Sequence, residues 1–121
     1  MKQETFRLRL RLYFGNLLML GPGKAELLAA VRDRGSISAA GRDLGMSYKR
    51  AWMLIEEMNA AFKEPVVQSS RGGSGGGGAQ LTEVGAEVLA QYSALVEKVG
   101  ELGAPEIAAL TALLRKEEGQ P

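Results

Sequence analysis

Two helical patterns joined by a glycine turn occupy residues 36–62. The first pattern consists of small residues, and either Ser36 or Ser38 is placed to accept the free N–H groups at its start. Gly45 stands where a helix would end in a left-handed residue, and Ser47 is placed to cap the second helix. Apolar residues of the second helix recur at helical spacing and form one stripe, made of Ala51, Leu54, Ile55, Met58 and Phe62.

The two patterns together predict a helix-turn-helix. Small residues in the first helix let the second cross it closely, and the glycine turn sets the angle between them. Tyr48, Lys49, Arg50 and Met53 lie at the edge of the apolar stripe or outside it, near the start of the second helix. We expect Lys49 and Arg50 to reach base edges or phosphates in the DNA major groove. For Trp52, core packing is favoured over a DNA contact. An ordinary helical hairpin with a solvated charged edge fits this stretch equally well on its own.

A strict alternation of apolar residues with arginine and tyrosine runs from Phe6 to Phe14. It predicts a half-buried strand. For the outward arginines, protection of a sheet edge is favoured over contact with DNA. Residues 21–23 break the chain, and a helix is expected from near Lys24 to Gly35, packed behind the helix-turn-helix.

Residues 66–81 have the pattern of a β-hairpin. Two short extended segments, 66–70 and 79–81, flank Arg71 and the run GGSGGGG. Directly after a helix-turn-helix, such a hairpin is the wing of a winged-helix domain, and its glycines let backbone N–H groups approach phosphates closely. The candidate DNA contacts in the wing are Arg71, Gly72, Gly73, Ser74 and Gly75.

The glycine-rich run has other interpretations. A flexible linker is disfavoured, because a linker joins two self-sufficient units and neither flank is one. A nucleotide-binding loop is excluded, because no Gly-Lys-Ser or Gly-Lys-Thr follows the glycines. A loop without a function stays open at this point.

A long helix is expected to begin after Thr82, its candidate cap, with Glu83 at the positive end of the helix dipole. A narrow apolar seam follows with steps of three and four residues, made of Val84, Val88, Tyr92, Leu95, Val99 and Leu102. The seam either packs on its own domain or pairs with a second copy, and the length of the helix favours pairing. Residues 103–105 interrupt the helix, and a final leucine-bearing helix follows. The sequence therefore divides into a winged-helix core at 1–81 and C-terminal dimerisation helices at 82–121.

Composition and charge narrow the function classes. With no Cys and no His among 121 residues, disulfides, the usual zinc sites and serine–histidine or cysteine–histidine catalysis are excluded. Glu56 and Glu57 are adjacent, and neighbours on a helix do not converge on one point, so an enzyme is not expected.

The net charge of +1 hides an asymmetry, because residues 1–81 contain 12 Lys or Arg against 7 Asp or Glu, and residues 82–121 contain 3 against 7. We expect the basic part to face phosphates. With no signal-peptide pattern and no long apolar run, a cytoplasmic protein is expected.

The runs GSISAAGRDLGMSYKRAWMLIEEMN and RGGSGGGGAQLTEVGAEVLAQY carry a family resemblance. In this order and spacing they resemble the N-terminal domain of the ModE-type molybdate-responsive transcriptional regulators. The resemblance covers roughly residues 5–100. More distantly, GSISAA and LTEVG are similar to the winged helix of LysR-type regulators.

The resemblance implies a mostly α (α+β) winged helix-turn-helix protein that binds a palindromic operator in double-stranded DNA as a homodimer. On this pattern residues 47–50 (Ser47, Tyr48, Lys49 and Arg50) match the start of the recognition helix, and residues 71–78 match the wing. Ser36 and Ser38 are then expected near the phosphate backbone. Full-length ModE-type regulators carry C-terminal domains that bind molybdate, and residues 103–121 are too short for one, so neither a cofactor nor direct molybdate sensing is expected.

A protein of another class is compatible with the same elements. A winged helix that has lost DNA binding can act as a protein–protein adaptor through its hydrophobic seam. The low net charge favours this alternative, and the basic residues Lys49, Arg50 and Arg71 disfavour it. A basic face over the second helix and the wing distinguishes a DNA-binding regulator from a protein–protein adaptor.

Overall fold

A computed structural model describes residues 6–70 and 78–115 of the chain. Its elements follow one another as β1 (Leu12–Phe14), β2 (Leu18–Leu20), α1 (Pro22–Arg34), α2 (Ile37–Asp43), α3 (Tyr48–Ala61), β3 (Val67–Ser70), β4 (Gly78–Leu81), α4 (Glu83–Leu102) and α5 (Ala104–Ala112). The chain is mostly helical with two small antiparallel sheets, and it has the winged helix-turn-helix arrangement that the sequence predicted.

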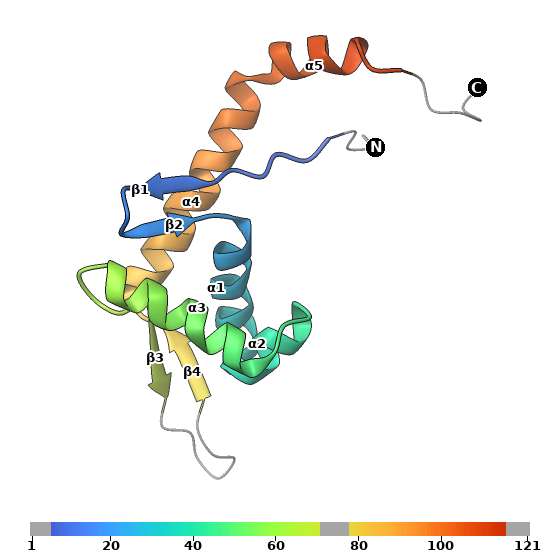
Figure 1. The fold of residues 1–121 in the computed structure, drawn as a ribbon. Coiled ribbons are helices and arrows are strands. Elements are labelled where there is room, and N and C mark those ends of the chain that lie inside the picture. Colours follow the sequence, from blue (N-terminus) through green and yellow to red (C-terminus); the bar gives the residue numbers. More distant parts are fainter. Residues whose placement is uncertain (1–5, 71–77, 116–121) are drawn as a thin grey trace.

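Helices α1, α2 and α3 form the body of the molecule (Figure 1). Helix α2 packs against both α1 and α3, and the β3–β4 hairpin projects from the body beside α3. Helix α4 runs from the hairpin past the body and ends in α5, at the opposite end of the molecule from the hairpin (Figure 1). The hairpin and α5 are therefore free to face different partners.

The local signals at the helix-turn-helix are confirmed. Ser36 is the cap of α2, and its Oγ accepts from the N–H of Ala39 at 3.1 Å. Gly45 has a φ of 72°, a left-handed conformation that glycine adopts without steric cost. Ser47 Oγ accepts from the N–H of Arg50 at 3.1 Å and caps α3. These caps satisfy N–H groups that each helix start would otherwise leave without a partner.

The N-terminal strand is shorter than the alternation predicted. Only Leu12–Phe14 pair, and they pair with Leu18–Leu20, a strand that the pattern did not indicate. Gly15, with a φ of 54°, lies in the turn between the two strands. Helix α1 begins at Pro22 rather than near Lys24, because proline at the first helical position lacks only an N–H that would have no intrahelical partner.

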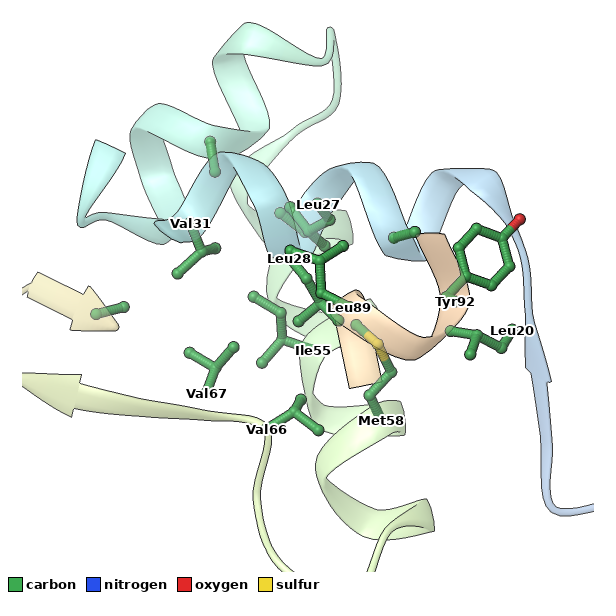
Figure 2. Packing of buried hydrophobic residues seen from close by; sticks show 14 of the residues in the cluster. Leu20, Leu27, Leu28, Val31, Ile55, Met58, Val66, Val67, Leu89 and Tyr92 are labelled. Atoms are coloured by element: carbon green, nitrogen blue, oxygen red, sulfur yellow. The ribbon is translucent and has the colours of Figure 1, made fainter. Parts of the chain in front are cut away.

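One hydrophobic core joins these elements (Figure 2). The largest side chains that are almost completely buried come from α1, from α3 and from the residue before β3, and they are Leu27, Leu28, Val31, Ile55, Met58 and Val66. The core fixes α3 by its buried face only, so its other face is available to a ligand.

The apolar seam of α4 divides into two parts. Val84 and Val88 are half-buried against the core, and Tyr92 is buried in it, so this part packs on its own domain. The later part is open: Leu95 and Val99 are half-buried, and Leu102 is 82% exposed. Helix α5 adds the exposed residues Leu110, Leu113 and Leu114 at the same end. Across the described ranges, every helix is either too short or too polar to cross a membrane.

Candidate nucleic-acid interface

Helix α3 has a buried face and a face that is open to solvent. Ala51, Ile55 and Met58 are buried. Tyr48 is 57% exposed and Met53 is 52% exposed, and Lys49 and Arg50 are exposed as well. The structure thus places these four predicted contacts together on the first turns of α3, outside the core.

The predicted serine contacts lie around the same helix end. Ser36 and Ser38 are half-buried at the start of α2, and Ser38 Oγ accepts from Arg42 Nη1 at 3.0 Å. Ser47 is exposed, and its oxygen is already used in capping α3. Each hydroxyl keeps its O–H as a donor, the group that a phosphate oxygen accepts from.

Trp52 does not pack in the core as the sequence favoured. It is 45% exposed and lies one turn after Tyr48 on the flank of α3 that faces the hairpin. There it lines a hollow of about 290 Å³ with seven other residues, which are Ser36, Ile37, Ser38, Tyr48, Ser69, Gly78 and Ala79. Trp52 lies beside the apolar stripe rather than in it, and β4 contributes only the small residues Gly78 and Ala79 to the hollow that Trp52 lines.

The charges around the interface differ in their pairing. Lys49 and Arg50 make no ion pair within the described ranges. Arg34 Nη1 contacts Asp43 Oδ1 at 2.6 Å, so this cation of α1 is neutralised on α2. Arg32 is paired with Asp33, and the hydrogen bond from Arg32 lowers the pKa of the Asp33 carboxyl. At the start of α3, then, two cationic side chains face solvent and form no ion pair with any residue that the structure describes.

The hairpin is held in register beside α3. Strand β3 pairs antiparallel with β4, from Val67 opposite Leu81 to Ser70 opposite Gly78. The N–H of Ala79 also donates to the carbonyl of Gly35 at 2.9 Å, which fixes β4 to the end of α1. The predicted wing contacts Arg71, Gly72, Gly73, Ser74 and Gly75 lie outside the described residues.

Asn59 ties the end of α3 to the beginning of the hairpin. Its Oδ1 accepts from the N–H groups of Val66 and Val67 at 2.7 and 3.2 Å, and its Nδ2 donates to the carbonyl of Val67 at 3.3 Å. Thr82 Oγ1 donates to the carbonyl of Pro65 at 2.6 Å and accepts from the N–H of Gly85 at 3.0 Å. Sequence reasoning identified the cap at Thr82 but not Asn59, because its partners are backbone groups that no side-chain pattern reveals.

Together these contacts make a surface suited to duplex DNA. An exposed helix with two solvent-facing cations lies beside a β-hairpin, and serine and tyrosine hydroxyl groups line part of the hollow between them. A helix of this kind fits the major groove, while hydroxyls and backbone N–H groups bind the phosphates on either side.

Comparison with known proteins agrees with this geometry. Residues 23–86 match the model of a family described as bacterial regulatory helix-turn-helix proteins, lysR family. The chain belongs to this family of non-enzymatic regulators, so it contains a helix-turn-helix DNA-binding domain.

Particular relatives and structures resemble the chain over the same region. It is 45% identical over 83 residues to the molybdenum-pterin-binding protein MopB of Rhodobacter capsulatus, covering 69% of this chain and 31% of MopB. It is 40% identical over 80 residues to the DNA-binding transcriptional dual regulator ModE of Escherichia coli strain K12, covering 66% of this chain and 30% of ModE. The chain thus spans about a third of the length of these relatives.

A solved structure shares the fold. The crystal structure of the CbnR DNA-binding domain in complex with DNA superposes with a TM-score of 0.58 at 22% identity, covering 73% of this chain and 95% of that one.

Proposed function

We propose that this protein is a sequence-specific transcriptional regulator that binds a palindromic operator in double-stranded DNA as a homodimer. Helix α3 enters the major groove, with Lys49 and Arg50 on base edges or phosphates. The serines at 36, 38 and 47 contact the phosphate backbone, and the wing, including residues 71–75, lies on the flanking backbone and minor groove. The proposed setting is the cytoplasm.

The observation that carries the proposal is the open face of α3. Lys49 and Arg50 are exposed on the first turns of a helix whose opposite face is fixed in the core, and neither makes an ion pair within the described ranges. Exposed cations on a rigid helix attract DNA phosphates, and their binding releases the counterions that were condensed on the DNA. The similarity to the ModE regulator, a protein described as DNA-binding, supports the same assignment.

The proposed homodimer uses the C-terminal helices. Leu95, Val99 and Leu102 continue the apolar seam of α4 beyond the core, and α5 adds further exposed leucines. In this arrangement residues 1–81 bind DNA and residues 82–121 pair two copies. A dimer presents its recognition helices about 34 Å apart, which matches half-sites one DNA turn apart.

The test compares two variants that each remove one positive charge. Arg50→Ala should weaken binding to operator DNA by roughly 10-fold or more and leave the urea midpoint of unfolding unchanged, because the side chain is exposed. Lys63→Ala is the matched control, since Lys63 is also exposed but follows the far end of α3, about 20 Å along the helix. Loss of stability with unchanged DNA affinity in Arg50→Ala would overturn the role of this residue.

A further inference from the structure

Three large apolar side chains are exposed together on the recognition helix. Tyr48 is 57% exposed, Trp52 is 45% exposed and Met53 is 52% exposed. Residues four apart on a helix are neighbours on its surface, so Tyr48 and Trp52 form one row, and Lys49 and Met53 form the next. Over the first two turns this face has one charge, Lys49, among three apolar groups, and the exposed Glu56 and Glu57 follow on the next turn.

The chemistry of this face selects among the bases. In the major groove thymine alone presents a methyl group, whereas guanine and adenine are read by bidentate hydrogen bonds from Arg, Lys, Asn or Gln. On helix α3, Lys49 and Arg50 can bind guanine or phosphate. The helix contains no Gln, and its one Asn, Asn59, is held by the backbone of Val66 and Val67. The side chains of Trp52 and Met53 are therefore suited to apolar contact with the methyl group of thymine.

The surroundings of Trp52 explain why the apolar face stays open. Gly78 and Ala79 of β4 leave a hollow of about 290 Å³ beside Tyr48 and Trp52, and nothing within the described ranges fills it. Ser36, Ser38 and Ser69 place hydroxyl groups on the other walls of the hollow. The apolar groups thus lie next to donors suited to a DNA backbone, which indicates a nucleic-acid partner for this surface.

We infer that Tyr48, Trp52 and Met53 determine specificity by packing on the C5-methyl groups of thymine in each half-site. The inference rests on the proposed function and names the bases that its recognition helix reads. Lys49 and Arg50 contact base edges or phosphates as proposed above, and the methyl contacts distinguish T·A from C·G pairs.

The experiment removes the methyl groups without changing base pairing. Duplexes that bind the protein are first selected from a random-sequence pool, and each fixed thymine is then replaced by deoxyuridine. We expect about fourfold weaker binding for each contacted methyl group, corresponding to ~0.8 kcal/mol per methyl-sized group. Deoxyuridine outside the selected half-sites should leave the Kd unchanged.

Variants connect the effect to the named side chains. Met53→Gln keeps a similar length and an exposed position, and should bind thymine and deoxyuridine duplexes equally at the position that Met53 contacts. Leu17→Gln is the matched control, because Leu17 is 65% exposed in the turn between β1 and β2, and should keep the full preference for thymine. Thermal unfolding verifies that both variants are folded.

The outcomes separate the inference from the function on which it rests. If selection fixes no sequence, the proposed specific regulator is wrong, and the inference fails with it. If sequences are fixed but contain no thymine in the half-sites, or bind equally well with deoxyuridine, the regulator stands and the methyl contacts are wrong.

Discussion

Gly85 at the start of α4 lies directly against the backbone of Val66 at the start of the wing. A Cβ built on Gly85 would lie 2.9 Å from the carbonyl carbon of Val66 and closer still to its oxygen. The atoms it would meet are backbone, and Val66 is completely buried, so neither side can move aside cheaply. This contact joins the helix of the proposed dimer interface to the wing that flanks the recognition helix.

The first prediction follows from that contact. Gly85→Ala should lower the free energy of unfolding by about 3 kcal/mol, at the upper end of the effect of overpacking, measured by urea denaturation. Gly23→Ala is the control, because a Cβ there meets nothing within 4 Å and the change should stabilise α1 by about 0.5–1 kcal/mol. Equal stability of the Gly85 variant and the wild type would show that α4 does not approach Val66 this closely.

A second prediction concerns the Asn59 hydrogen bonds to the wing. Asn59→Leu leaves the buried N–H groups of Val66 and Val67 without their acceptor, and an unsatisfied buried donor costs about 1–3 kcal/mol. We expect a loss of about 3 kcal/mol in the urea experiment. Asn59→Asp keeps the acceptor oxygen and should lose clearly less. Equal losses for Leu and Asp would rule out the acceptor role.

A third prediction separates the two roles of Ser47. Because its Oγ caps α3 at Arg50, Ser47→Ala should lose about 1 kcal/mol of stability, whereas Ser47→Asp and Ser47→Asn keep a cap and should lose little. Asp also places a negative charge where we propose phosphate to bind. DNA affinity, measured by fluorescence anisotropy, should therefore fall in the Asp variant and stay near the wild-type value in the Asn variant. Equal affinities would place Ser47 away from phosphate.

Tyr92 gives a prediction on pH dependence. Burial raises the pKa of its phenol, while Arg9 and Arg11 lower it in part. The folded protein then holds the phenolic proton more tightly than the unfolded chain, so the stabilisation is complete below the ordinary tyrosine pKa of about 10 and is lost as the pH rises through the higher folded value. The free energy of unfolding should decline in this alkaline range, and less steeply in Tyr92→Phe. Identical slopes in the two proteins would contradict the assignment.

The proposed dimer predicts a change in mass on substitution at the open end of α4. Leu102 is 82% exposed in one chain, and Leu102→Glu should convert a dimer into a monomer in sedimentation equilibrium. Leu17→Glu alters a residue that is 65% exposed in the turn between β1 and β2, and it should leave the dimer intact. If the wild-type protein is a monomer at high concentration, the proposed dimer interface is wrong.

Short-range signals allowed much of the fold to be predicted. The caps at Ser47 and Thr82 and the left-handed Gly45 depend on a few adjacent residues, and the structure confirms them. The N-terminal strand was predicted too long, because alternation shows a compatible pattern and not the length of the partner strand, here only Leu18–Leu20.

The candidate site was predictable only in part. The start of α3 follows from its cap and its stripe, so the position of Lys49 and Arg50 was accessible from the sequence. Trp52 was assigned to packing wrongly, because its exposure depends on the small residues Gly78 and Ala79, which lie far along the chain. Tyr92 was predicted to take part in dimerisation. In the structure its side chain is buried in the core of its own domain, and its hydroxyl donates to the carbonyl of Leu10.

The central claim is specific binding to DNA, and a titration of the protein against its own upstream DNA across salt concentrations tests it most directly. We expect saturable binding to a palindrome that exceeds binding to random DNA by roughly a thousandfold or more and weakens steeply with salt. Weak binding that is equal on every sequence would contradict the account and favour a winged-helix adaptor for another protein.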